Sequence, residues 1–116
     1  MSKKDAIFFL LHIEDAINKI EEFSENISKD DFDSDDLRQS AIIRQVEILG
    51  EASKNLPIEF TKKYSKTPWQ EMARMRDKLI HHYFGVDTDI VWKVLKDDLP
   101  ALRKQIQEII KKEKKN

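Results

Sequence analysis

The sequence predicts an all-α fold: an up-and-down helical bundle of four to five helices, in a single domain over residues 1–116. Two observations favour helices. The chain has only two glycines and three prolines, and its apolar residues recur at three- and four-residue steps rather than alternating. The length suits one domain. Because a chain this small buries a limited share of its surface, self-association would add to its stability.

The first helix is expected over residues 3–26, with Ser2 placed to cap it. Its apolar residues lie at helical spacing and are Ile7, Leu10, Leu11, Ile17, Ile20 and Phe23. Residues 28–36 are acidic and lack periodicity, so they are predicted to form a loop. Asp33 or Ser34 is well placed to cap the helix that follows.

The second helix is predicted from an apolar stripe that ends near Pro57. The stripe consists of Leu37, Ala41, Ile42, Val46, Leu49, Ala52 and Leu56. Pro57 is expected to end this helix or to start a short one through about Lys63. The clearest start signal comes next, in Thr67-Pro68-Trp69-Gln70, with threonine at the cap and proline pre-set at the first helical position. It predicts a helix from Pro68 to about His81.

Gly85 is expected to end that helix, because glycine takes the left-handed geometry that closes a helix. Asp87 or Thr88 then caps a last helical stretch through Asn116. Its apolar face consists of Ile90, Val91, Val94, Leu95, Leu102, Ile106 and Ile109. Pro100 lies inside this stretch, which predicts a kink or break near residue 98.

The charges are unevenly distributed along the chain, although the net charge is only −1. Residues 14–36 carry ten acidic and two basic side chains, whereas residues 54–116 carry fifteen basic and nine acidic ones. Such asymmetry can give one protein a basic surface for a polyanion and an acidic surface elsewhere. Solvated helix faces without a partner account for the same pattern.

Several classes of protein are excluded by composition. The absence of cysteine excludes disulfides, thiolate zinc sites and a cysteine nucleophile, and fits a cytoplasmic location. No apolar run approaches the roughly 20 residues of a membrane span, and the N-terminus is expected to belong to the mature protein. Two glycines are too few for the phosphate loops of Walker and Rossmann sites.

The chemically active side chains concentrate in residues 72–86. They are Arg74, Arg76, His81, His82 and Tyr83. A metal site is not supported, because the remaining histidine, His12, is distant in sequence and neither an HExxH motif nor a cysteine pair is present. No metal and no other cofactor is therefore predicted.

Acid/base chemistry on a phosphodiester fits this segment better. Such chemistry needs a group that titrates near neutrality, as His81 does, and a permanent cation for the transition state, as Arg76 supplies. On an ideal helix Arg76 and Tyr83 share a face, whereas His81 is displaced from Arg76 by about 140°. Either the helix unwinds near His81, or a second copy completes the site across a two-fold axis. Polar residues favoured at a helix end explain the same segment without a site.

The segment from Arg76 to Tyr83 has the form R-x4-H-x-Y and resembles the signature of the HepT-like branch of the HEPN-domain ribonuclease toxins. Asp77, directly after the arginine, also suits that pattern. A second segment, residues 43–52, resembles the R-x2-E-x2-GEA stretch of the same branch. With the length and the helical pattern, the resemblance covers nearly the whole chain.

The resemblance implies a HEPN-like helical domain that forms a homodimer and cuts RNA without metal. His81 would be the general acid/base that assists attack by the 2′-hydroxyl, and Arg76 would stabilise the charge on the phosphate. Asp77 would orient one of these two residues. Dependence on the 2′-hydroxyl would make the enzyme specific for RNA.

Tyr83 has a separate implied role in such toxin–antitoxin systems. The partner would be a cognate minimal nucleotidyltransferase antitoxin, which adenylylates this tyrosine. An ordinary amphipathic tyrosine at a helix end is the alternative. The competing function for the whole chain is a non-catalytic nucleotide-binding or scaffold subunit of a nucleotidyltransferase complex.

Arg44, Glu47 and Glu51 lie at three- and four-residue steps on one helical stripe. We expect them to form ion pairs within the helix or to face a dimer partner, rather than to take part in catalysis. Trp69 and Trp92 are expected in the core or an interface.

Overall fold

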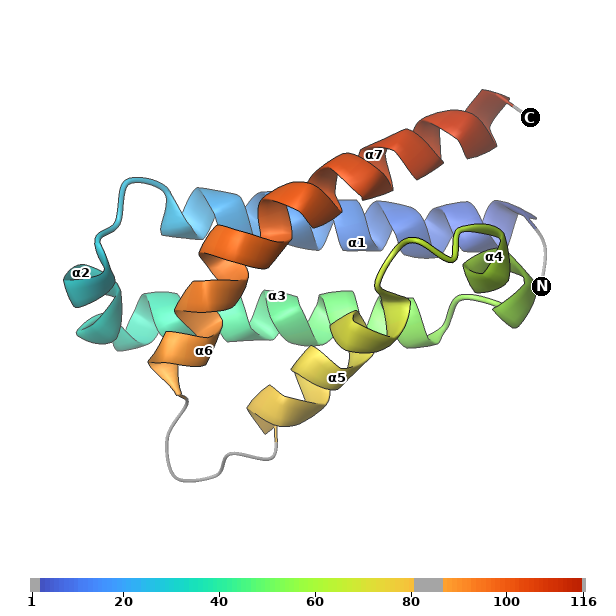
Figure 1. The fold of residues 1–116 in the computed structure, drawn as a ribbon. Helices are drawn as coiled ribbons and strands as arrows, with labels where there is room; N and C mark the ends of the chain where they lie inside the picture. Colours follow the sequence, from blue (N-terminus) through green and yellow to red (C-terminus); the bar gives the residue numbers. More distant parts are fainter. Residues whose placement is uncertain (1–2, 81–86, 116) are drawn as a thin grey trace.

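The computed structural model describes residues 3–80 and 87–115, and all of their regular structure is helical (Figure 1). The longer helices are α1 (Lys3–Ser24), α3 (Asp36–Lys54), α5 (Trp69–Ile80) and α7 (Leu99–Lys115). Shorter elements are α2 (Lys29–Asp33), α4 (Ile58–Lys63), α6 (Thr88–Lys93) and the π-helical turn η1 (Val94–Asp98). The predicted all-α class is confirmed for the described residues.

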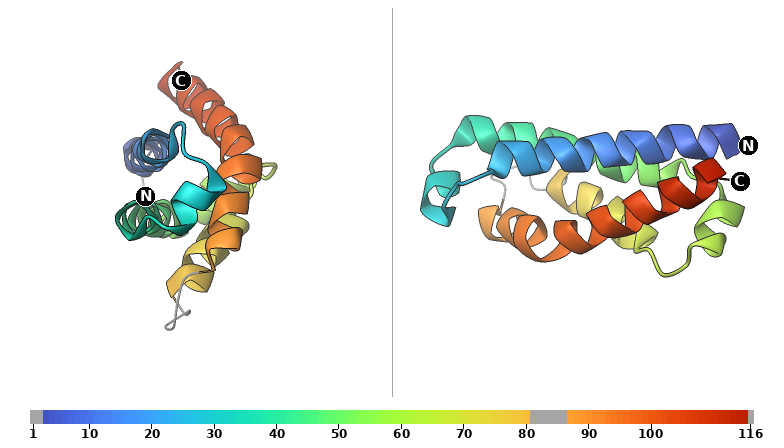
Figure 2. Two further views of the ribbon diagram at one scale, coloured as in Figure 1. Left: turned by 90° about the vertical axis from the view of Figure 1, so that its left-hand side faces the viewer. Right: turned by 90° about the horizontal axis from the view of Figure 1, so that it is seen from above.

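The long helices run up and down (Figure 1). Helices α1 and α3 are antiparallel neighbours, and α5 packs on the side of α3 away from α1. The last stretch, from α6 through η1 into α7, turns back along the bundle and packs against α1 (Figure 2). Among the described residues no helix is long and apolar enough to cross a membrane.

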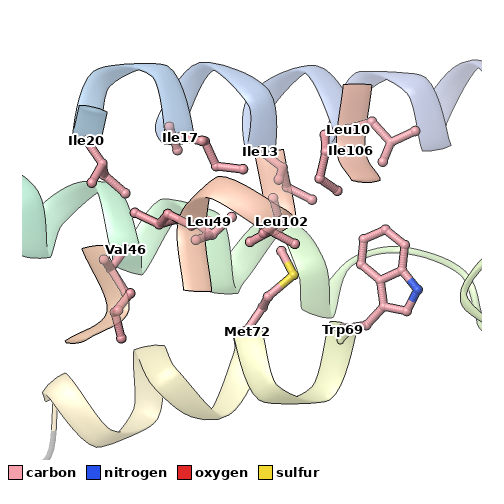
Figure 3. Packing of buried hydrophobic residues seen from close by; sticks show 14 of the residues in the cluster. Leu10, Ile13, Ile17, Ile20, Val46, Leu49, Trp69, Met72, Leu102 and Ile106 are labelled. Carbon is pink, nitrogen blue, oxygen red and sulfur yellow. The ribbon is translucent and has the colours of Figure 1, made fainter. Parts of the chain in front are cut away.

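The core lies where α1, α3, α5 and α7 meet, and Figure 3 shows its centre. Its most deeply buried residues include Leu10, Ile13, Ile17, Ile20, Ile42, Leu49, Met72 and Ile106. The α1 members recur every three or four residues, which places them on one face of the helix. Burying each such side chain contributes about 1.5–3 kcal/mol, so this face holds α1 against its neighbours. Trp69 is also buried in this core, as predicted.

The loop predicted over residues 28–36 is partly wrong, because it contains α2. The Ser28 hydroxyl accepts a hydrogen bond from the third residue of this helix, and the side chain of Phe32 is fully buried. The Phe32 ring packs 5.6 Å, centroid to centroid, from the ring of Trp92. A helix as short as α2, with one buried apolar residue, shows no periodicity in the sequence. The contact of Phe32 with Trp92 stabilises it instead.

The cap of α3 also differs from the prediction. It is Asp35, whose carboxylate accepts a hydrogen bond from the backbone N–H of Arg38 at 3.0 Å, rather than Asp33 or Ser34. Asp33 is the last residue of α2, and Ser34 is the C-cap of that helix. The existence of α2 therefore moves the cap along the chain.

The other helix boundaries follow the sequence signals closely. Pro57 precedes α4, and α5 begins at Trp69, one residue after the predicted start. Asp87 caps α6, since its carboxylate accepts from two backbone N–H groups at 3.0 and 3.4 Å. The predicted caps Ser2 and Gly85 lie outside the described residues.

The irregularity expected before Pro100 is a π-helical turn. In η1 the backbone N–H of Leu99 reaches the carbonyl of Val94, five residues back. Proline has no N–H and its ring crowds the preceding turn, so a wider turn accommodates it without ending the helical path. The predicted kink or break thus takes the form of a π turn.

Candidate functional site

Arg76 projects from α5 towards α3 and lies between two carboxylates. Its Nη1 donates a hydrogen bond to Oδ1 of Asp77 at 3.1 Å. Its Nε lies 3.6 Å from Oε2 of Glu51 on α3, which makes an ion pair but not a hydrogen bond. Nε itself is buried and has no hydrogen-bond partner among the described residues. The guanidinium is thus held on one side by its own helix and on the other by α3.

Gly50 allows the two helices to approach at this point. A β-carbon at position 50 would overlap the Cβ of Arg76 and would lie 3.1 Å from the carbonyl oxygen of Met72. Both neighbours belong to α5, and one of them is helix backbone. Only glycine fits without moving α5, so Gly50 sets how closely Arg76 lies to α3.

Asp77 is shared by two cations. The ammonium of Lys54 donates to Oδ1 of Asp77 at 3.1 Å, and Arg76 donates to the same oxygen. The Lys54 ammonium first, and the Arg76 guanidinium second, lower the pKa of the Asp77 carboxyl below its usual range. We refer to Glu51, Lys54, Arg76 and Asp77 as the α3–α5 charge network. It pairs two cations with two carboxylates, so its formal charges cancel.

Arg76 lines a groove of about 430 Å³ between α1, α3 and α5. The α1 wall holds Phe8, Phe9 and His12, and the rings of Phe8 and His12 meet edge to face at 4.5 Å. Phe8 is 57% exposed although it is a large hydrophobic residue. An aromatic, partly apolar surface therefore lies opposite the cation.

Sequence reasoning did not place His12 at the site, where it lines the same groove as Arg76. The two residues are far apart along the chain, and no motif links them. Only the packing of both α1 and α5 against α3 brings them to one groove.

The residues of the second resembling stretch divide into two kinds. Arg44 and Glu47 form the predicted ion pair within α3, with Nη1 and Oε2 3.4 Å apart. Glu51 departs from the expectation, because it pairs with Arg76 of another helix. Its position directly after Gly50, where α3 and α5 are in close contact, explains the difference.

The other predicted site residues, His81 and Tyr83, lie outside the described residues. Helix α5 is α-helical through Ile80, the residue before His81. Across the described ranges, 3–80 and 87–115, no group of three histidine, cysteine, aspartate or glutamate side chains is arranged to hold a metal ion.

An all-helical domain whose R-x4-H arginine is held by carboxylates beside a groove fits the class of small helical ribonuclease domains. A family model described as Ribonuclease HepT-like matches residues 13–109. The chain belongs to this HepT-like ribonuclease family.

Relatives agree with this assignment. The chain is 50% identical over 103 residues to a Thermococcus cleftensis protein named "Probable ribonuclease HepT", covering 89% of this chain and 94% of the relative. It is 48% identical over 106 residues to a "Putative RNase" of Caldanaerobacter subterraneus, covering 91% and 95%. These relatives support a ribonuclease activity.

A further relative is longer than this chain. The chain is 46% identical over 114 residues to a "Gamma-glutamylcyclotransferase and putative RNase" of Methanocaldococcus jannaschii. The match covers 98% of this chain but only 51% of that protein. No solved structure matches the chain significantly.

Proposed function

We propose that the chain is a metal-independent endoribonuclease in which Arg76 and His81 act on the phosphodiester. The observation that carries the proposal is the position of Arg76: the arginine of the R-x4-H motif lies beside a groove, fixed between Glu51 and Asp77. This is what a stabiliser of transition-state charge requires, since donors placed in advance need no reorganisation during the reaction.

The proposed reaction is a transfer within the RNA strand. His81 takes the proton of the 2′-hydroxyl, whose oxygen attacks the adjacent phosphorus. The bond from phosphorus to the 5′-oxygen breaks, which leaves a 2′,3′-cyclic phosphate, and the departing oxygen takes up the proton that His81 accepted. Arg76 stabilises the negative charge that develops on the phosphoryl oxygens. A guanidinium carries five N–H donors, more than its two carboxylate neighbours occupy, so donors remain for the phosphate.

We further propose that the working unit is a homodimer. Helix α5 stays regular through Ile80, so no unwinding within the described part of α5 corrects the displacement of about 140° between Arg76 and His81. A second copy would bring an independent histidine towards Arg76. The exposed aromatic surface of the groove, Phe8 above all, supports an additional contact there.

The toxin–antitoxin context rests on the resemblance. In this proposal a minimal nucleotidyltransferase is the cognate antitoxin, and it transfers AMP to Tyr83 and so blocks the cleft with a bulky anion. Incubating the purified pair with ATP and mapping the modified residue by mass spectrometry tests this step. Unmodified Tyr83, or AMP on another residue, would contradict it.

The ribonuclease proposal is tested with purified protein, RNA and a metal chelator. We expect cleavage of RNA but not of the same strand with 2′-deoxy nucleotides. Arg76→Ala and His81→Ala should abolish cleavage, whereas Arg74→Ala, which changes an exposed arginine two residues before Arg76 on α5, should retain it. A light-scattering mass should be that of a dimer.

The alternative, a non-catalytic subunit of a nucleotidyltransferase complex, makes the opposite prediction. The chain would then bind its partner, yet leave RNA intact under every condition. Cleavage that survives both Arg76→Ala and His81→Ala would contradict the roles proposed for these two residues.

A further inference from the structure

We infer that Glu51 is a positioning residue for Arg76, a role that rests on the proposed ribonuclease function. The carboxylate of Glu51 reaches Arg76 from the neighbouring helix and holds the guanidinium in the orientation in which it meets the scissile phosphate. Glu51 itself touches neither RNA nor the reacting atoms in this scheme.

The first argument is geometric. A guanidinium is a flat group at the end of a long, flexible side chain. Asp77 contacts it through Nη1 at 3.1 Å, which leaves the plane free to turn about that contact. Glu51 lies against a different nitrogen, Nε, at 3.6 Å. Two anchors on two nitrogens, from two helices, define the plane.

The second argument concerns the buried Nε of Arg76. Its N–H has no hydrogen-bond acceptor among the described residues, and a buried donor without an acceptor is unfavourable. The negative charge of Glu51 is the ion-pair partner that offsets this cost. Without it, Arg76 would gain by swinging Nε towards water, away from the geometry seen here.

The third argument separates positioning from a purely structural role. Lys54 and Asp77 already form an ion pair between α3 and α5, at 3.1 Å. The close contact of Gly50 with α5 holds the helices together independently of charge. The side chain of Glu51 is 57% exposed, so its removal leaves no cavity. The fold therefore does not depend on the Glu51–Arg76 ion pair as a further contact between α3 and α5. The orientation of the Arg76 guanidinium does depend on it, because Asp77 alone does not define the plane.

Glu47 offers a matched control. It lies one turn before Glu51 on the same helix, lines the same groove and pairs with Arg44 of its own helix. Glu47→Gln therefore removes an equal charge from the same surface without touching Arg76.

The kinetic test compares Glu51→Gln with Glu47→Gln on one RNA substrate. For Glu51→Gln we expect kcat to fall by about 10- to 100-fold, the scale of a small misplacement of a catalytic group. KM should stay the same or decrease, because the uncompensated Arg76 still attracts phosphate. Glu51→Asp should recover part of the loss, and Glu47→Gln, which does not touch Arg76, should lower kcat much less than Glu51→Gln does.

A second readout does not depend on activity. The nitrogen-15 relaxation of Arg76 Nε should report a restricted guanidinium in the wild type and in Glu47→Gln, but a mobile one in Glu51→Gln. If wild-type protein fails to cut RNA while this difference is observed, the proposed function fails and the positioning stands. If Glu51→Gln leaves both kcat and the Nε relaxation unchanged, the positioning role is overturned.

Discussion

Gly50 of α3 lies so close to Arg76 of α5 that a β-carbon at position 50 would overlap the β-carbon of the arginine. The glycine and the arginine belong to the two separate segments that resemble the HepT-like pattern. Their contact gives that co-occurrence a physical reason: the glycine brings α3 up to the base of the arginine, and the next residue, Glu51, reaches its guanidinium.

Replacing Gly50 by alanine should destabilise the fold. Alanine favours an isolated helix over glycine by about 1 kcal/mol, but overpacking a close contact typically costs about 1–3 kcal/mol. We expect the free energy of unfolding, measured with denaturant, to fall for Gly50→Ala. Ser40→Ala, at an exposed position of the same helix, should be neutral or slightly stabilising. A Gly50→Ala protein more stable than the wild type would show that α5 moves away easily.

Asp77 should stabilise the fold at neutral pH and lose this effect in acid. Its folded pKa lies below the ordinary value of 3.8 because of Lys54 first and Arg76 second. A carboxyl whose pKa is lowered by folding stabilises the folded state at pH values above its pKa in the unfolded chain. This stabilisation is lost as the pH falls through its pKa in the folded protein. Unfolding free energies of the wild type and Asp77→Asn should therefore differ by a constant amount at neutral pH and converge below about pH 4.

Lys54→Met gives the matching check on this cause. Removing the ammonium should raise the Asp77 pKa towards its ordinary value, which a carboxyl NMR titration measures. An unchanged pKa would mean that Arg76 alone sets it.

Tyr64 should contribute to stability through Glu113 of α7. The phenol donates to Oε2 of this buried carboxylate at 2.5 Å. Tyr64→Phe removes one partner of that carboxylate, so we expect a loss of about 1–2 kcal/mol of unfolding free energy, measured by denaturant titration. Lys62→Met on the exposed side of α4 should have little effect and serves as the control.

The Tyr64 phenol should also make the free energy of unfolding depend on pH in the alkaline range. Burial first, and the Glu113 carboxylate second, raise the Tyr64 pKa above its ordinary value of 10.0. A phenol whose pKa is raised by folding stabilises the folded state at pH values below its pKa in the unfolded chain. This stabilisation is lost as the pH rises through its pKa in the folded protein. The advantage of the wild type over Tyr64→Phe should therefore shrink above pH 10. An advantage that persists at higher pH would contradict the assignment.

Arg76→Lys should be nearly as inactive as Arg76→Ala in RNA cleavage. Lysine keeps the charge, but a single ammonium cannot face two carboxylates and a phosphate through separate nitrogens. The loss of one well-placed donor typically costs about 10²- to 10³-fold in kcat. Arg74→Lys is the control. Substantial activity in Arg76→Lys would mean that charge alone suffices at this position.

Local sequence located most helices because helix starts, stops and apolar faces are decided by residues a few positions apart. Pro57 precedes α4 and Asp87 caps α6, and the π turn lies just before Pro100. The exception is α2, which is too short for a periodic pattern. It depends on Phe32, buried against Trp92 from a distant part of the chain.

By itself the sequence determined the all-helical class, most of the helix boundaries and the choice of Arg76 as the candidate charge stabiliser, since each depends on local spacing or on a short motif. Only the tertiary structure decided what surrounds that arginine. Partners such as Lys54 and Asp77 are 23 positions apart, and Glu51 appeared to belong to a stripe on its own helix. These partners come together because of the way α3 crosses α5. Gly50, which has no side chain, allows the two helices to approach closely at that point.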